Sequence, residues 1–160
     1  MPYTASVTTL LAILVVLGQI GAVLLVGALL LRRNETAKKM VSFVGHHAYQ
    51  IAFVVAFVST AGSLLYSEIA GYNPCKMCWI QRIFMYPQVL ILAIGDKYKD
   101  RMTSLHALTL SGFGAVIAGY HYLLQLGIVP ELSCGAVGFS ESCSKRFVMT
   151  FGYVTIPMMA

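Results

Sequence analysis

The chain has 160 residues, of which 58% are hydrophobic and only 11% are charged. Soluble domains are about half apolar and about one quarter charged, so this composition excludes an ordinary soluble domain and indicates a membrane protein. The formal net charge of +5 does not indicate nucleic-acid binding, because the basic residues fall in short clusters between apolar runs. We therefore expect membrane lipid, and no nucleic acid, around this protein.

Four apolar stretches predict an all-α membrane protein, a bundle of four membrane-spanning helices in a single domain that covers residues 1–160. A helix rises about 1.5 Å per residue, so roughly 20 residues cross the hydrocarbon of a bilayer. We place the spans at about 7–31, 43–66, 79–95 and 104–126. The cysteines lie in the two remaining long segments, which we interpret as loops, at 67–78 and 127–160.

Lysine and arginine predict the orientation, because short cytoplasmic loops collect them. The turns after the first and third spans hold most of these residues, namely Arg32, Arg33, Lys38, Lys39, Lys97, Lys99 and Arg101. The opposite side holds only Lys76, Lys145 and Arg146. The rule therefore places the N-terminus and both cysteine loops outside the cytoplasm, where disulfides can persist.

The cysteines form two pairs of different character. Cys75 and Cys78 make a C-x-x-C at the outer mouth of the third span, and we expect Cys78 to open that helix. Free N–H groups, the helix dipole and Lys76 would stabilise a thiolate there. Cys134 and Cys143 flank a segment with glycines and serines that is flexible enough to reach another sulfur. The pattern predicts a reactive pair beside a mobile relay.

Two other interpretations of the cysteines stay open from the residues alone. Two structural disulfides would staple extracytoplasmic loops, although such staples rarely need a C-x-x-C at a helix mouth beside an intramembrane arginine. A four-thiolate zinc site would need matched C-x-x-C spacing, which the second pair lacks, so we expect no metal.

Two polar residues in the spans are candidates for ligand binding. Arg82 follows Cys78 by one helical turn on the same face, about 6 Å deeper. A buried arginine costs about 2.5–3.5 kcal/mol, so it either reaches the interface or has a partner, for example a quinone oxygen that gains negative charge. His121 lies near the outer end of the fourth span, either as a packing residue or beside Arg82 in a site. Gln81 and Gln88 are candidates for hydrogen bonds between helices.

These residues resemble the DsbB-type disulfide bond formation proteins, closest to the BdbC branch. The resemblance runs from about Val58 to Ala160 and leaves out residues 1 to about 40. Its most specific part is a C-x-x-C-x-x-Q-R run that enters a membrane helix. The matching residues are Tyr66-Ser67-Glu68, the run from Pro74 to Pro87, His121-Tyr122 and the later cysteine pair.

The resemblance implies a four-helix bundle in a bacterial cytoplasmic (inner) membrane, multi-pass, with extracytoplasmic cysteine loops. It implies an enzyme, a quinone-dependent protein-disulfide oxidoreductase that reoxidises a thioredoxin-like extracytoplasmic thiol oxidase. The electrons would pass to ubiquinone or menaquinone. By position, Cys78 would contact the quinone, Cys75 would be its disulfide partner, and Arg82 and His121 would lie beside the quinone head.

On the client side, the resemblance implies that Cys134 is attacked by the reduced partner and that Cys143 carries the exchange onward to Cys75. One rival is a vitamin K epoxide reductase-like enzyme, but its separated pair precedes the C-x-x-C, whereas here the C-x-x-C comes first. A second rival is a nonenzymatic membrane protein with disulfide-stapled loops. It predicts that neither pair changes redox state when a quinone is added.

The chain departs from the family pattern at both ends. The family continues after a motif similar to 151–157 into a last membrane helix, but this chain stops at Ala160. An additional span, Val7 to Leu31, precedes the family's first helix and would run in the direction of the last one. We hypothesise that it fills that place in a circularly permuted bundle with both termini outside. The alternative is a truncated chain with a peripheral first span.

Overall fold

The computed structural model describes residues 2–31, 33–98, 100–130, 142–144, 146 and 148–159. Helices make up nearly all of this described part. They are α1 (Pro2–Leu30), α2 (Glu35–His46), α3 (Ala48–Leu64), a π-helical turn η1 (Leu65–Ile69), α4 (Lys76–Tyr98), α5 (Arg101–Gln125) and the short α6 (Ile156–Met159). The expectation of an all-α protein is confirmed.

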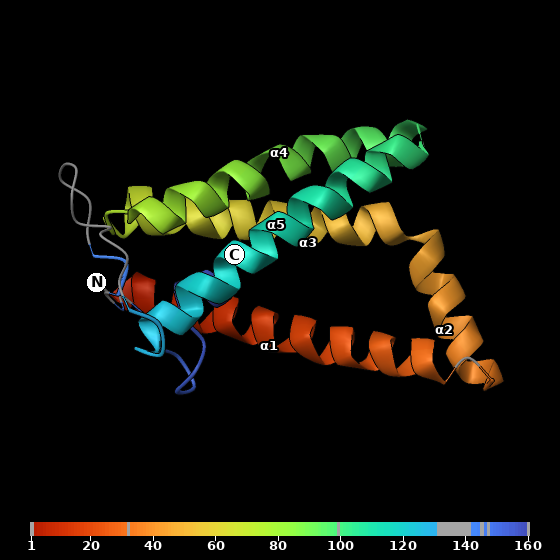
Figure 1. Cartoon of the computed structure of the whole chain (residues 1–160), viewed down its shortest axis with the longest axis horizontal. Coiled ribbons are helices and arrows are strands. Elements are labelled where there is room, and N and C mark those ends of the chain that lie inside the picture. Colours follow the sequence, from red (N-terminus) through yellow and green to blue (C-terminus); the bar gives the residue numbers. More distant parts are fainter. Residues whose placement is uncertain are drawn as a thin grey trace.

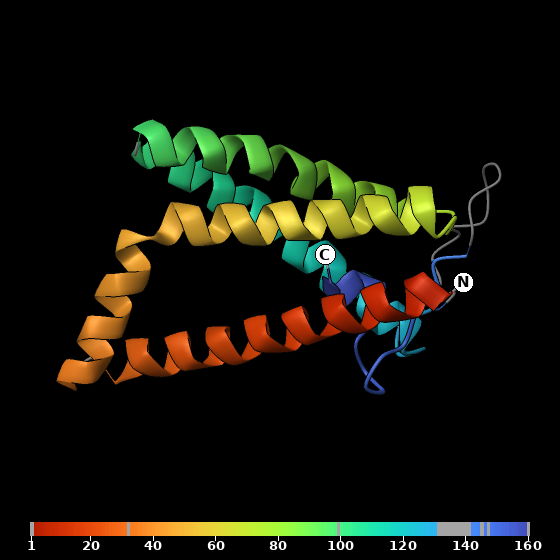
Figure 2. The same cartoon turned by 180° about the vertical axis from the view of Figure 1, so that it is seen from behind.

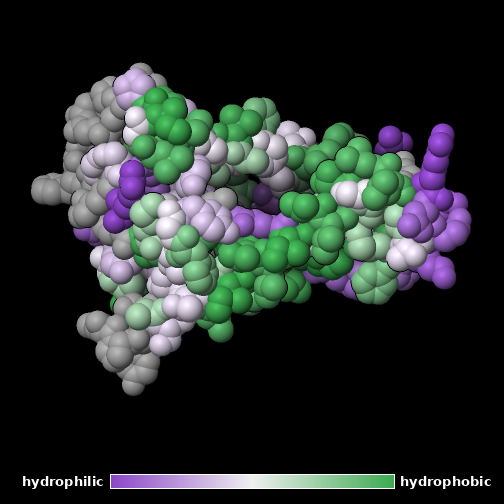
Figure 3. Space-filling view, turned by 90° about the horizontal axis from the view of Figure 1, so that it is seen from below, coloured by the Kyte–Doolittle hydropathy of each residue, from purple (hydrophilic) through white to green (hydrophobic). Residues whose placement is uncertain are grey.

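Four helical segments are long and apolar enough to cross a membrane. They are Ala5–Leu30, Ala48–Ile69, Lys76–Tyr98 and Arg101–Gln125. Figure 3 shows hydrophobic side chains over the middle of the molecule and hydrophilic ones at the end where α2 lies. Exposed apolar side chains on the outer faces, such as Val23, Leu90 and Val116, suit contact with lipid. The molecule is therefore a membrane bundle, as the composition predicts.

The expected span 43–66 is divided in the structure. His47, with φ −102° and ψ 15°, separates α2 from α3. The side chain of Asn34 starts α2 by accepting the backbone N–H of Thr36 at 3.1 Å. Figures 1 and 2 show α2 lying across the end of the bundle between α1 and α3. Helix α2 is amphipathic and combines adjacent Lys38 and Lys39 with apolar residues such as Val41 and Phe43, a pattern that favours the membrane surface over the hydrocarbon.

Helices α3, α4 and α5 pack together and form the main core. The centre of this core consists of Ala56, Leu92 and Ala107, one from each helix. At Gly95 a side chain would collide with its neighbours, since an added Cβ would lie 2.6 Å from the Tyr49 ring and 2.7 Å from Thr103. Close approach of the three helices at this point therefore requires glycine.

Helix α1 packs against α2 at one end of the molecule and approaches the remaining helices at the other end, near the N-terminus of the chain (Figure 2). Leu11 packs 3.2 Å from the position that a Cβ of Gly62 would take in α3. The hydroxyl of Tyr66 donates to Thr8 Oγ1 at 3.2 Å, and α6 packs against both α1 and α5. These contacts make α1 a neighbour of α3 and α6, and the circular permutation stays a prediction.

The segment 148–157 is not the surface loop that the sequence suggests. Val154 and Thr155 are buried, behind a tight turn in which Phe151 and Gly152 have positive φ angles of 55° and 79°. Tyr153 ties this turn to two helices, because its carbonyl accepts from Tyr122 of α5 at 3.2 Å and its hydroxyl donates to Gln19 of α1 at 3.3 Å. The segment thus closes the cysteine end of the bundle.

Candidate redox site

Cys75 and Cys78 lie in direct contact at the start of α4. Their Sγ atoms are 2.8 Å apart, and both are thiols in this structure. Cys75 is buried, with 3% of its surface exposed, whereas Cys78 is half-buried. The two sulfurs are therefore placed to form and break a disulfide without a large backbone movement.

The helix begins at Lys76, two residues before the expected start at Cys78. Cys75 takes the capping position, because its carbonyl accepts the N–H of Trp79 at 3.1 Å and its Sγ accepts the N–H of Cys78 at 3.3 Å. Cys78 lies within the first turn and does not open the helix. The hydrogen bond to Cys78, together with burial, raises the pKa of the Cys75 thiol to about 12. Cys75 therefore retains its proton in the reduced pair.

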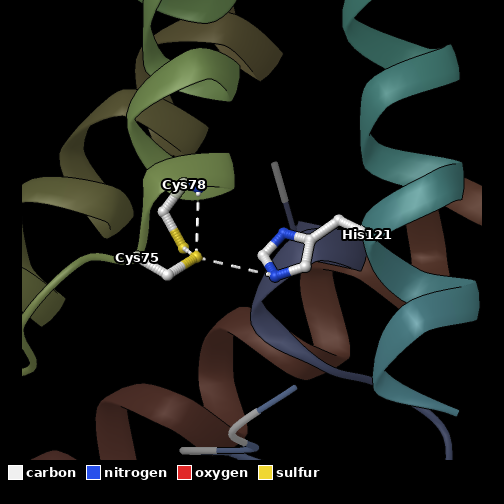
Figure 4. A group of neighbouring side chains, drawn as sticks. All are labelled: Cys75, Cys78 and His121. Carbon is white, nitrogen blue, oxygen red and sulfur yellow. Dashed lines mark hydrogen bonds between the residues drawn. The ribbon is translucent and has the colours of Figure 1, made fainter. Parts of the chain in front are cut away.

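His121 approaches the pair from α5, with 1% of its surface exposed. Figure 4 shows the ring edge turned toward Cys75, and the Nε2 to Sγ distance is 3.7 Å. The same Nε2 lies 3.1 Å from the carbonyl oxygen of Cys143, and Nδ1 lies 3.4 Å from Oε1 of Gln81. His121 thus joins α4, α5 and the second cysteine segment.

The second cysteine pair is described in part. Cys143 is buried, with 1% of its surface exposed, and packs with Cys75 and Leu124 in one apolar cluster. Cys134 lies outside the described residues, so its predicted role as the first sulfur to meet a client stays a prediction. This cluster places Cys143, one member of the second pair, beside Cys75 of the first pair.

An apolar cavity of about 530 Å³ opens on the other side of the pair. Cys78, Gln81 and Arg82 contribute to its wall, and the rest is largely apolar. Helix α1 supplies Leu11, Leu14, Val15 and Gly18, and α3 supplies Val54, Val58, Gly62 and Ser63. His121 and Cys75 are not among the residues that line this cavity. The structure therefore places Arg82 with Cys78, and His121 with Cys75.

The guanidinium of Arg82 is held by Ser63 of α3. Its Nε donates to Ser63 Oγ at 3.1 Å and its Nη2 donates to the Ser63 carbonyl at 3.1 Å. The guanidinium also lies 5.0 Å from the ring centre of Trp79 and 5.9 Å from that of Tyr86. Its Nη1 makes no hydrogen bond to any residue that the structure describes. That nitrogen is a cationic donor available to a ligand oxygen.

The three side chains do not have the arrangement of a zinc site. Ligand atoms of Cys75, Cys78 and His121 lie within 4.8 Å of one another. Two thiolates bound to one zinc ion, at about 2.3 Å each in a tetrahedron, would lie about 3.8 Å apart. The observed sulfur separation is 2.8 Å, which suits a dithiol that becomes a disulfide.

The residues alone predict some of these contacts and miss others. The pairing of Arg82 with Cys78 is predicted by their spacing along one helix. Gln81 is an expected hydrogen-bonding residue between helices, and its contact with His121 confirms that expectation. Ser63 is missed, because a serine in an apolar stretch carries no pattern that identifies it as the partner of an arginine on another helix.

Four apolar helices and a contacting C-x-x-C at the mouth of one of them define a membrane protein with a redox-active dithiol. The family model of the disulfide bond formation protein DsbB matches residues 45–157. The chain belongs to the DsbB family and is a membrane disulfide-forming oxidoreductase.

Curated relatives agree with this assignment. A probable disulfide formation protein of Oceanobacillus iheyensis is 44% identical over 111 residues, covering 69% of this chain and 76% of the relative. Disulfide bond formation protein C of Bacillus subtilis is 40% identical over 114 residues, covering 68% and 78%. A prophage-derived disulfide bond formation protein B of the same organism is 40% identical over 112 residues, covering 70% and 74%. No solved structure matches the chain significantly.

Proposed function

We propose that this protein reoxidises a thioredoxin-like extracytoplasmic thiol oxidase and passes the electrons to a membrane quinone, ubiquinone or menaquinone. The observation that carries the proposal is the position of Cys78 in the wall of an apolar cavity that also contains Arg82. A lipid-soluble oxidant can enter such a cavity from the membrane, and a sulfur at its wall can deliver electrons to it.

The cavity fits a quinone because it combines apolar walls with unpaired donors. Quinone oxygens accept hydrogen bonds and gain negative charge on reduction. Nη1 of Arg82 lacks a partner among the described residues, and Nε2 of Gln81 is buried without one. A cation and an amide N–H beside one cavity therefore suit the oxygens of a quinone head.

The opposite side of the dithiol suits exchange with a protein client. Cys75 and Cys143 share one buried cluster, and a second cysteine segment beside the first pair supports a relay of disulfides in series. The basic turns lie at the end of the bundle away from the cysteines (Figure 1). Under the charge rule, the cysteine end then faces the extracytoplasmic side of a bacterial cytoplasmic membrane.

Anaerobic mixing tests this function. Purified protein in detergent is mixed with ubiquinone or menaquinone analogues and a reduced thioredoxin-like oxidase, and quinone absorbance is followed. We expect stoichiometric loss of the quinone signal and one new disulfide in the client per quinol formed. A matched control is Ser142→Ala, which leaves all four cysteines in place. Absence of quinone reduction by the wild type, with either the client or a small dithiol as donor, would contradict the proposal.

A further inference from the structure

Gln81 contacts His121, which lies beside Cys75, and also lines the cavity that contains Cys78. Its Oε1 lies 3.4 Å from Nδ1 of His121, on the side of Cys75. Gln81 also belongs to the wall of the cavity that contains Cys78. Its amide nitrogen, Nε2, is buried and has no hydrogen-bond partner among the described residues. A buried amide with one end bonded and the other end unpaired beside a cavity points to a ligand that accepts a hydrogen bond.

The contacts of His121 restrict where its protons lie. A neutral imidazole has one N–H and one lone pair. If Oε1 of Gln81 accepts from Nδ1, the lone pair belongs to Nε2, which faces the thiol of Cys75 at 3.7 Å. When Nε2 takes a proton, it can donate to the Cys143 carbonyl at 3.1 Å. The ring then has an oxygen acceptor at each nitrogen.

We propose that Gln81 is a positioning residue that couples the two sides of the dithiol. Its Oε1 fixes His121 with a basic Nε2 toward Cys75, and its amide N–H donates to a carbonyl oxygen of the quinone in the cavity. The second contact rests on the proposed function, whereas the first concerns this chain alone. His121 accordingly serves the thiol side, and its contact with the quinone is not required.

In this proposal His121 accepts the proton of the Cys75 thiol. When the Cys75–Cys78 disulfide forms, the S–H bond of Cys75 breaks and its proton passes to Nε2 of His121. The sulfur–sulfur bond forms, and two electrons leave through the sulfur of Cys78. The Cys78 thiol gives its proton to the solvent, and the quinone takes up two protons from the solvent with the two electrons. His121 releases the Cys75 proton to water before the next turnover, so that in sum two thiols and one quinone give one disulfide and one quinol. Because the pKa of Cys75 is raised to about 12, a neighbouring proton acceptor is needed at neutral pH.

Three variants separate the two contacts. Gln81→Glu keeps an acceptor for His121 and loses the N–H toward the cavity, Gln81→Met loses both, and Gln88→Met is a matched control. Gln88 lies on the same face of α4 but bonds Ser111 and the Phe84 carbonyl. All three variants are compared with the wild type by thermal unfolding in detergent, so that any loss of folding is recognised.

The first measurement is nitrogen-15 NMR of the histidines in the reduced protein without quinone, with the His121 signals assigned by their loss in His121→Asn. We expect Nδ1–H and an unprotonated Nε2 in the wild type, in Gln81→Glu and in Gln88→Met. Gln81→Met should change to the Nε2–H tautomer, which bonds the Cys143 carbonyl. An Nε2–H tautomer in the wild type, or no change in Gln81→Met, would overturn the positioning of His121.

The second measurement is steady-state quinone reduction. We expect Gln81→Glu to raise KM for the quinone about tenfold with a smaller change in kcat, because it loses one hydrogen bond to the ligand. Gln81→Met should raise KM equally and also lower kcat about tenfold. Unchanged KM in both variants overturns the contact with the quinone. If the wild type reduces no quinone, the proposed function fails, while the NMR result still decides the role of Gln81 toward His121.

Discussion

The two sulfurs of one C-x-x-C have opposite surroundings. Cys75 faces groups of the protein itself, with His121 Nε2 at 3.7 Å and Cys143 in the same buried cluster, and is almost fully buried. Cys78 faces an apolar cavity with Arg82 in its wall. In the proposed function this difference would separate the two reactants, because one side of the dithiol is closed by protein and the other lines an apolar cavity.

The largest expected effect comes from removing one sulfur from each pair. Cys78→Ser should abolish quinone reduction with any thiol donor, because no sulfur then remains at the cavity wall. Cys134→Ser should block only the reaction with the protein client and retain quinone reduction from a small dithiol. Quinone absorbance under anaerobic conditions measures both. Equal loss in the two variants with the small dithiol as donor would show that the two pairs do not face different reactants.

Arg82→Met tests the cavity side. Charge-assisted hydrogen bonds contribute about 1.5–3 kcal/mol, so we expect quinone affinity to fall about 10-fold to 100-fold. Thermal unfolding should change less, although Ser63 also loses its partner. Ser63→Ala is the matched control, because it removes one contact of the guanidinium and leaves the charge. Unchanged quinone affinity in Arg82→Met would return this arginine to a packing role.

The surroundings of Cys75 are tested by measuring the pH at which its thiol loses the proton. In the reduced protein, alkylation of Cys75 followed by mass spectrometry should show a pH midpoint near 12. In Cys78→Ala that midpoint should fall toward 9.0, because the hydrogen bond that the Cys75 thiol donates to Cys78 is the largest cause of the raised value. A midpoint that does not move would assign the shift to burial alone.

The same proton links pH to stability. A raised pKa means that the folded state holds the proton more tightly than the unfolded state. The reduced fold therefore keeps this contribution below about pH 9.0 and loses it as pH rises toward about 12. Denaturant unfolding of the reduced protein should accordingly show lower stability at high pH, and Cys75→Ala should reduce that dependence.

Sequence patterns predict contacts along one helix better than contacts between helices. The pairing of Cys75 with Cys78 and of Cys78 with Arg82 depends only on helical spacing, and the spans follow from hydropathy. Neither helical spacing nor hydropathy predicts how α5 is rotated relative to α4. The sequence therefore suggests His121 beside Arg82, whereas in the structure His121 points toward Cys75. The sequence also does not predict α2 as a separate helix, because the apolar residues at its end continue directly into the following span.

The smallest expected effect concerns α1, which lies outside the matched family region, residues 45–157. Gly18 lines the cavity, whereas Gly21 does not, and an added Cβ would meet nothing within 4 Å at either position. Gly18→Phe should therefore fill part of the cavity and raise KM for the quinone a few-fold, at about 1 kcal/mol of lost binding. Gly21→Phe, one turn away on the same helix, should leave KM unchanged.

Both glycine variants keep the cysteines, Arg82 and the family region intact, and both add one aromatic side chain to α1. A difference between them in quinone reduction thus reports the wall of the cavity and not the helix as a whole. A raised KM for Gly18→Phe alone makes α1 a working part of the bundle, as the hypothesis of a substituted fourth helix requires. Equal KM values for both variants and the wild type would make α1 a peripheral addition, and the redox site would then depend on α3, α4 and α5 alone.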